Sequence, residues 1–188
     1  GLNFDSQSGG LNGLSGSVKN NKIFGAEGNG NNVFLIGSHY NPSFSNYSGM
    51  TIEHNDIYGT NRVNVELCGG LRGLTLQHNY LDHAGYIWSG TEYVMSAASI
   101  AAPTKLNYGI GITMIRTGVV VTNYTLETQN RLEDLTVDGN TITNSQKMGI
   151  YSEAMIDDVV ISQNSISGSG WRGIWLDESG TFNAPKAN

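Results

Sequence analysis

The chain has 188 residues, a formal net charge of −6, 14% charged residues and 25 glycines. Its length fits one domain, and a glycine-rich composition with regularly recurring aliphatic residues is typical of a turn-rich β-protein rather than a helical or disordered chain. The acidic balance without a basic cluster argues against nucleic acid as a partner, no apolar run is long enough to span a bilayer, and the single Cys68 excludes an internal disulfide framework.

A six-residue phrase recurs five times: an aliphatic residue, two variable residues, an asparagine, a variable residue and a second aliphatic residue. The copies are residues 18–23, 52–57, 76–81, 137–142 and 161–166. Asn55 and Asn79 are 24 residues apart, as are Asn140 and Asn164, and this period corresponds to one coil of a parallel β-helix. Each asparagine is predicted to end a strand, to tolerate a left-handed turn and to hydrogen-bond to the asparagine of the next coil.

A second phrase begins eight to twelve residues after the asparagine. The gap is therefore predicted to be a loop of variable length, and the phrase is predicted to be a third strand. Its copies begin at Val33, Val63, Ile150 and Ile174, and the last three of these are expected to point inward. Three strands and three bends in each coil predict a triangular prism.

Residues 82–133 interrupt the repeat, because Asn79 and Asn140 are 61 residues apart where two coils would take about 48. We expect a strand at 110–115 and a long loop over 82–107. The alternative places the strand at 86–88 and the insertion on the following bend. Long insertions in a compact domain are more often functional than idle.

These phrases resemble the coils of right-handed parallel β-helix proteins of the pectin-lyase-like superfamily, over residues 14–180 and weakly between 82 and 133. The fold prediction is an all-β, right-handed parallel β-helix with about six to eight coils in a single domain over 1–188. Neither end offers an evident cap, which predicts missing β-helix segments or a homo-oligomer. The resemblance implies a carbohydrate-active protein of the glycoside hydrolase or polysaccharide lyase type, although a fold does not fix a function.

The third strands are predicted to carry a row of acids on their outer face. Three places after the inward residue, the outward residue on the three strands is Glu66, Glu153 and Asp177, respectively. Stacked strands lie about 4.8 Å apart, so Glu153 and Asp177 are expected to be close enough for one pKa to rise. One protonated and one ionised carboxyl group are what a glycosidase needs, and Glu66 with Glu153 offers a wider pair.

The same face is predicted to hold sugar-binding residues. Asn64, Tyr151 and Trp175 follow the inward residues, Trp171 and Arg172 precede the last strand, and Trp88 is expected to reach over from the insertion. The phrase at 173–178, Gly-Ile-Trp-Leu-Asp-Glu, is similar to phrases of β-helix glycosidases. That resemblance implies a role for Asp177 in glycan cleavage. The alternative is that the acids only form a solvated face of the solenoid.

Two further rows of polar residues are expected to be mainly structural. His54 and His78 precede consecutive ladder asparagines and should stack at the bend. The acidic pairs at 133–134 and 157–158 should also stack, either as two acidic turns or as a structural Ca²⁺ site near Asp134, Asp157 and Asp158. No other metal or cofactor is expected.

The sequence therefore predicts a glycoside hydrolase that cleaves an extended polysaccharide. The chain shows no signal peptide, and we expect a mature protein that is secreted, extracellular or periplasmic. A polysaccharide lyase or epimerase acting on a uronate polymer is one alternative, but only Arg172 and Lys147 would offset the three acids. A non-catalytic β-helix that binds glycan, such as a phage tailspike or adhesin segment, is the other. The expected partner is a polysaccharide or oligosaccharide, with no nucleic acid and no membrane.

Overall fold

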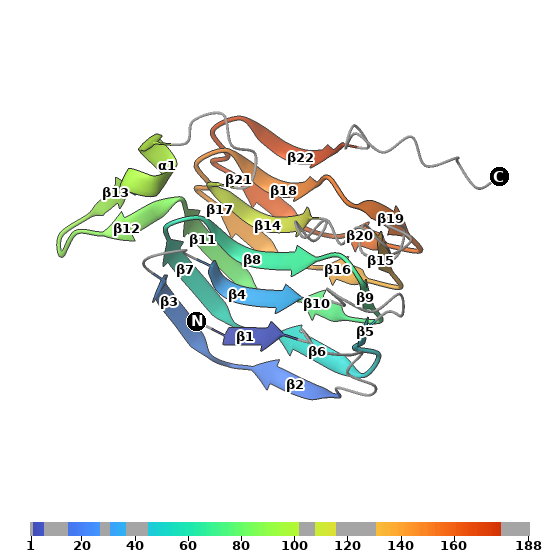
Figure 1. The fold of residues 1–188 in the computed structure, drawn as a ribbon. Helices are drawn as coiled ribbons and strands as arrows, with labels where there is room; N and C mark the ends of the chain where they lie inside the picture. Colours follow the sequence, from blue (N-terminus) through green and yellow to red (C-terminus); the bar gives the residue numbers. More distant parts are fainter. Residues whose placement is uncertain are drawn as a thin grey trace.

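The chain forms a right-handed parallel β-helix, in which short strands stack into parallel sheets around one axis (Figure 1). This computed structural model describes residues 2–5, 15–26, 31–36, 45–101, 108–115 and 131–177. A right-handed path is the usual one for parallel strands joined by crossovers, because each strand carries a right-handed twist. The fold is the one that the asparagine repeat predicted.

Three sheets form the walls of the coil. The six-stranded sheet contains β1 (Leu2–Asp5), β4 (Asn31–Ile36), β8 (Val63–Cys68), β14 (Ile110–Ile115), β18 (Met148–Ser152) and β22 (Arg172–Leu176). The sheet before the ladder contains β2 (Gly16–Lys19), β6 (Met50–Glu53), β10 (Thr75–Gln77), β16 (Thr136–Asp138) and β20 (Val160–Ser162). The sheet after the ladder contains β3 (Lys22–Ala26), β7 (Asp56–Thr60), β11 (Tyr80–Ala84), β17 (Thr141–Thr143) and β21 (Ser165–Ser167).

A fourth wall, which the three-strand prediction missed, is a sheet of very short strands between the six-stranded sheet and the sheet before the ladder. It contains β5 (Ser45–Asn46), β9 (Leu71–Arg72), β15 (Arg131–Glu133) and β19 (Met155–Asp157). With strands of two or three residues, no alternation of apolar and polar side chains is long enough to be recognised in the sequence.

The core runs along the axis of the coil. It is built from aliphatic residues at stacked positions, such as Ile52, Leu76 and Val137, which are in register on neighbouring strands and fully buried. Each such residue touches its counterparts above and below, so the core is a set of aliphatic rows rather than one central cluster. The six strands of the largest sheet agree with the lower bound of the predicted number of coils.

The asparagine ladder is present at the bend between the second and third walls. The Nδ2 atoms of Asn21, Asn55, Asn79 and Asn140 each donate to the Oδ1 atom of the next asparagine at 3.0 Å, and Asn164 is the last acceptor of the row within the described residues. The same Oδ1 atoms also accept a backbone N–H from the preceding coil. Each buried amide is thereby satisfied within the row, which is why one residue type recurs at this position.

The left-handed residue of this bend is the one before the asparagine, not the asparagine itself as predicted. This residue has φ between 52° and 60° in all five copies, which are Asn20, His54, His78, Gly139 and Gln163. His54 and His78 stack with ring centroids 5.4 Å apart, as the sequence indicated. At Gly139 an added Cβ would lie 2.4 Å from Nδ1 of His78, so the ring of His78 occupies the space that a side chain would need.

The insertion within 82–133 leaves the coil as an antiparallel hairpin. Its strands are β12 (Tyr86–Trp88) and β13 (Tyr93–Met95), followed by the single-turn α1 (Ala97–Ala101), and the hairpin projects from the side of the solenoid (Figure 1). The strand β14 completes the coil at 110–115, which confirms the first of the two predicted paths. The alternative, with a coil strand at 86–88, is wrong because those residues pair only within the hairpin among the described residues.

Candidate functional site

Two neighbouring strands end in the acids that the sequence singled out. Glu153 directly follows β18 and Asp177 directly follows β22. The backbone N–H of Glu153 donates to the carbonyl oxygen of Met114 at 3.0 Å, and that of Asp177 donates to the carbonyl oxygen of Ser152 at 2.7 Å. Asp177 therefore lies one coil after Glu153. Both side chains are partly exposed. Stacked strands lie about 4.8 Å apart, which brings two accessible carboxyl groups side by side.

Aromatic rings and a guanidinium group lie along the two strands that lead to this pair. Tyr151 and Trp175 are in register on β18 and β22, with ring centroids 5.4 Å apart. Trp171 contacts Trp175 edge to face at 5.1 Å, and the guanidinium carbon of Arg172 lies 4.3 Å from the ring centroid of Trp175. The hydroxyl of Tyr151 donates to Oε2 of Glu153 at 3.4 Å. This arrangement fixes Glu153 against a rigid ring and leaves half of Trp171 exposed.

Glu66 lies in a different row from the one predicted. In register it faces Thr113 of β14, which faces Tyr151 of β18, so Glu66 belongs to the row of Tyr151 and Trp175. The sequence had equated Val63 with Ile150, whereas Val65 occupies that level. A shift of two residues keeps every side chain on the same face, so alternation of apolar residues could not reveal the error.

The environment of Glu66 is closed and partly polar. Its side chain is only 4% exposed; Oε2 accepts a hydrogen bond from Nδ2 of Asn31 at 2.6 Å and lies 3.5 Å from Arg62. Burial raises the pKa of the Glu66 carboxyl above its usual range, and Arg62, Asn31 and Cys68 only partly oppose this, while Glu153 adds to it. Glu66 therefore retains its proton to a higher pH than an exposed glutamate.

This raised pKa predicts a stability change with pH. From the usual pKa of glutamate, 4.5, up to the raised value, the folded chain keeps the proton of Glu66 that the unfolded chain loses. The free energy of unfolding should therefore fall as the pH rises through that interval, and Glu66→Gln should remove this part of the decrease. Urea unfolding of both chains between about pH 4 and pH 8 measures it. Parallel profiles of the two chains would contradict the assignment.

Two other predicted site residues lie away from the carboxylates. Asn64 is fully buried, and its Nδ2 donates to the carbonyl oxygen of Asp82 at 3.1 Å, so it joins two walls of the coil rather than facing a ligand. Trp88 lies on the hairpin over the sheet after the ladder, where it contacts Tyr93. The expectation that it reaches the carboxylates is wrong. The hairpin leaves the coil at the edge where the strands of the six-stranded sheet begin, whereas the acids follow the ends of β18 and β22 (Figure 1).

The sequence analysis missed the residues that surround Trp88. Phe24 and Tyr58 each lie three places after a ladder asparagine, as does Asp82. Reading that position along the repeat would have found an aromatic pair followed by an acid on one outer face. His83, for which no role was predicted, has Nδ1 2.6 Å from Oδ2 of Asp82 and stacks on Tyr93.

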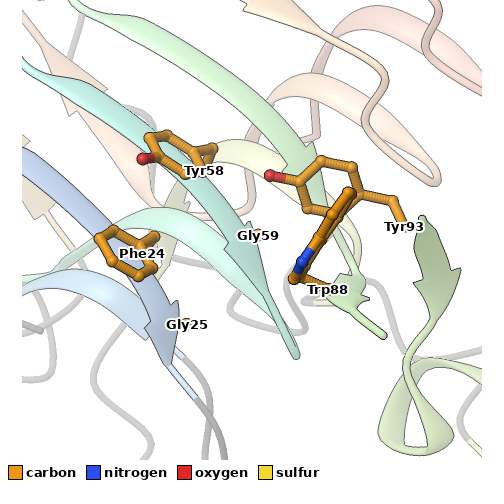
Figure 2. A pocket seen from close by; sticks show the side chains of 6 residues that line it. All are labelled: Phe24, Gly25, Tyr58, Gly59, Trp88 and Tyr93. Atoms are coloured by element: carbon orange, nitrogen blue, oxygen red, sulfur yellow. The ribbon is translucent and has the colours of Figure 1, made fainter. Parts of the chain in front are cut away.

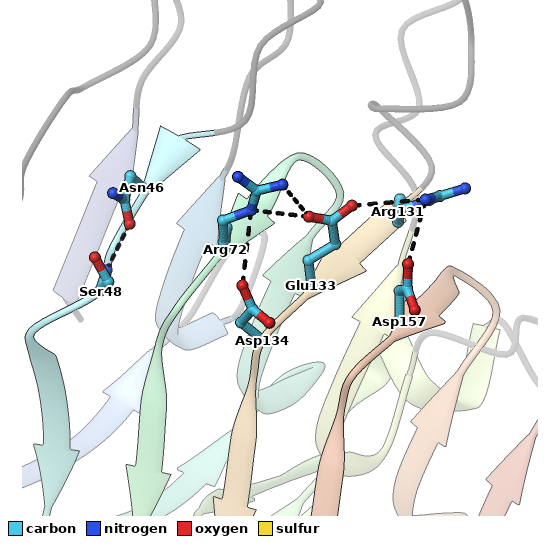
Figure 3. Close-up of polar contacts among 7 residues, drawn as sticks. All are labelled: Asn46, Ser48, Arg72, Arg131, Glu133, Asp134 and Asp157. Carbon is cyan, nitrogen blue, oxygen red and sulfur yellow. Dashed lines mark hydrogen bonds and ion pairs between the residues drawn. The ribbon is translucent and has the colours of Figure 1, made fainter.

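The acidic turns at 133–134 and 157–158 do stack, but Arg131 lies between them and Arg72 lies beside Glu133 and Asp134 on the preceding coil (Figure 3). Arg72 pairs with Glu133 and lies 3.8 Å from Asp134, and Arg131 lies 3.6 Å from Glu133 and 3.4 Å from Asp157. Among the residues that the structure describes, no three acids, histidines or cysteines gather as a metal site. The two guanidinium groups supply the positive charge that the predicted Ca²⁺ would have brought.

Residues 112–188 match a family model described as periplasmic copper-binding protein (NosD). That family has a parallel β-helix fold, so the match agrees with the architecture, while it gives no indication of a hydrolase or lyase. Its periplasmic location bears out the predicted location outside the cytoplasm. No helix within the described ranges has the length and apolarity to cross a membrane. No curated protein and no solved structure matches the chain.

The residues of the matched region do not fit a copper site. Residues 112–188 contain no histidine and no cysteine, the two ligands that copper prefers in proteins. Two of its methionines, Met114 and Met148, are fully buried among aliphatic side chains. The stacked His54 and His78 lie outside the matched residues, and no third ligand joins them in the described part of the chain. What the chain shares with this family is therefore the coil.

Proposed function

We propose that this β-helix hydrolyses a polysaccharide on the outer face of the six-stranded sheet, with Glu153 and Asp177 as the carboxyl pair. The observation that carries the proposal is this accessible pair at the ends of two adjacent strands, beside Trp175, Trp171 and Arg172. Like charges on neighbouring strands reduce stability. A pair kept in spite of that cost favours a chemical role.

The two acids have different surroundings, which favours different roles. A hydrogen bond from Tyr151 orients the carboxyl group of Glu153, which suits it as base or nucleophile. Asp177, one coil after Glu153, is then the candidate acid that protonates the glycosidic oxygen. Retaining glycosidases hold their two carboxyl groups about 5–5.5 Å apart, and adjacent strands offer such a spacing.

The aromatic cluster supplies a place for the sugar. Flat rings contact the apolar faces of sugar rings, and Trp171 is 52% exposed next to Trp175. Arg172 stacks on both indoles and adds a positive charge to the aromatic cluster. Arg62 pairs with the shielded Glu66, which leaves Arg172 with Glu153 and Asp177 on the accessible face. This balance fits a neutral glycan better than a uronate polymer and disfavours the lyase or epimerase alternative.

A depolymerisation assay on a panel of polysaccharides tests this proposal. The wild type should release new reducing ends without the absorbance of unsaturated uronates, and Asp177→Asn should release them at least about 100-fold more slowly. Reducing ends together with that absorbance would indicate a lyase instead. Absence of products from every glycan, with the wild type folded, would leave a non-catalytic β-helix.

A further inference from the structure

A cleft on another wall of the molecule is lined almost entirely by aromatic rings. It has a volume of about 290 Å³ and is bounded by Phe24, Gly25, Tyr58, Gly59, Trp88 and Tyr93. Figure 2 shows Trp88 and Tyr93 of the hairpin on one side, and Phe24 and Tyr58 of β3 and β7 on the other, with the two glycines between them. The carboxylate pair lies on the six-stranded sheet, so this cleft is separate from it.

The two glycines keep the floor of the cleft open. Gly25 and Gly59 occupy equivalent positions on neighbouring strands and have φ of 71° and 63°, a conformation that residues with a Cβ rarely adopt. A Cβ at Gly59 would lie 3.1 Å from Cε1 of Tyr93. The equivalent residue of the next coil is His83, also left-handed, so the open floor ends there.

His83 and Asp82 hold one wall of the cleft in place. The ring of Tyr93 stacks on His83 with centroids 3.8 Å apart, and Nδ1 of His83 lies 2.6 Å from Asp82. The other oxygen of Asp82 accepts hydrogen bonds from Thr143 and Asn144, at 2.6 and 2.9 Å. The wall is thus fixed to the coil through a chain of contacts before any ligand arrives, which lowers the entropy lost on binding.

The polar atoms at the cleft are suited to hydroxyl groups. Within the described residues, the hydroxyls of Tyr58 and Tyr93 have no hydrogen-bond partner, and both belong to rings that line the cleft. Burial and the nearby Asp82 raise the pKa of Tyr93, so its hydroxyl stays a donor at neutral pH. Asp82 and the neighbouring Glu92 would repel an anionic ligand.

From this geometry we infer that the cleft binds a neutral sugar residue of a glycan, with the exposed indole of Trp88 against one face of the ring and the hydroxyls of Tyr58 and Tyr93 bonded to its hydroxyl groups. A quaternary ammonium ion would instead need several ring faces directed at one point. Here Phe24 and Tyr58 stack on each other, at 5.4 Å and 6°, and Tyr93 is stacked on His83. The site does not depend on the proposed hydrolysis.

Fluorescence of Trp88 alone provides the test. The chain contains three tryptophans, so Trp171→Phe with Trp175→Phe leaves Trp88 as the only reporter. Titration with hexasaccharides of β-1,4-linked glucose, xylose or N-acetylglucosamine should give a saturable change with at least one of them. Phe24→Ala in this background should weaken that binding about tenfold, whereas Val160→Ala, an exposed change on the sheet before the ladder, should leave it unaltered.

The inference is overturned if none of these sugars changes the signal, or if only tetramethylammonium does. An equal affinity in the Phe24→Ala chain would also overturn it. Calorimetric titration of the otherwise unchanged chain against Trp88→Ala provides a second measurement that needs neither phenylalanine substitution, and it should show the loss of one binding site. Asp177→Asn should retain this binding, which separates failure of the cleft from failure of the proposed hydrolysis.

Discussion

Replacing Asn79 with alanine is expected to lower the free energy of unfolding by about 3–5 kcal/mol. The side chain of Asn79 donates to Asn140, Ile52 and Gln77 and accepts both the backbone and the side-chain N–H of Asn55. Alanine leaves several of these buried groups without partners, and each unpaired group costs about 1–3 kcal/mol. The midpoint and slope of urea unfolding measure the change.

Asn21→Ala provides the matched control for this ladder prediction. Asn21 stands at the exposed first step of the described ladder, where its N–H groups donate to Asn55 and Lys19 while its neighbours remain open to solvent. Water can replace those partners, so a loss of about 1 kcal/mol or less is expected. Equal losses in the two variants would mean that burial of the ladder does not strengthen its hydrogen bonds.

The fold could be predicted because the solenoid repeats its constraints. One asparagine per coil has to satisfy the next, and one aliphatic row has to fill the axis, so Asn55, Asn79 and their counterparts recur at a fixed period. The left-handed residue before each asparagine was harder to recognise. His54, Gly139 and Gln163 share a backbone conformation but no side-chain chemistry.

The rows of the candidate site follow from counting residues after each ladder asparagine. Glu153 and Asp177 lie at equal distances after consecutive ladder asparagines, so their common row follows from the count. Glu66 lies eleven residues after Asn55, as Tyr151 does after Asn140, so the same count gives its row. The prediction aligned Val63 with Ile150 instead, and alternation tolerates such a two-residue shift. The direction of the hairpin that carries Trp88 depends on its packing over Tyr58 and Gly59, which no local pattern encodes.

The partly exposed acids and the buried Glu66 differ in their access to water and to a substrate. Glu66 can keep a proton because it is shielded from water, but the same shielding separates it from a polymer on the surface. Glu153 and Asp177 are reachable and next to each other. We therefore assign contact with the substrate to this pair. We expect Glu66 to influence Glu153 only through its own protonation state, because a protonated Glu66 carries no negative charge.

Glu153→Gln and Asp177→Asn are each expected to lower kcat about 100- to 10,000-fold on the glycan that the wild type cleaves, because each removes one of the two proton-transfer or nucleophilic groups. Glu53→Gln is the matched control. Its carboxylate accepts a hydrogen bond from Gln77 on the sheet before the ladder, away from the carboxylate pair, so kcat should not change. Equal rates in all chains would remove the pair from the mechanism.

Azide distinguishes the two acids by the configuration of the product. If Glu153 is the nucleophile, Glu153→Ala leaves a space in which azide attacks the anomeric carbon once, so the glycosyl azide is formed with inverted configuration. If Asp177 is the acid and base, Asp177→Ala still forms the covalent intermediate with a good leaving group, and azide then displaces Glu153 with overall retention. If the two variants gave the opposite configurations, Asp177 would be the nucleophile and Glu153 the acid and base. If the wild type hydrolysed its substrate with inversion, the proposed nucleophile would instead be a base that activates water.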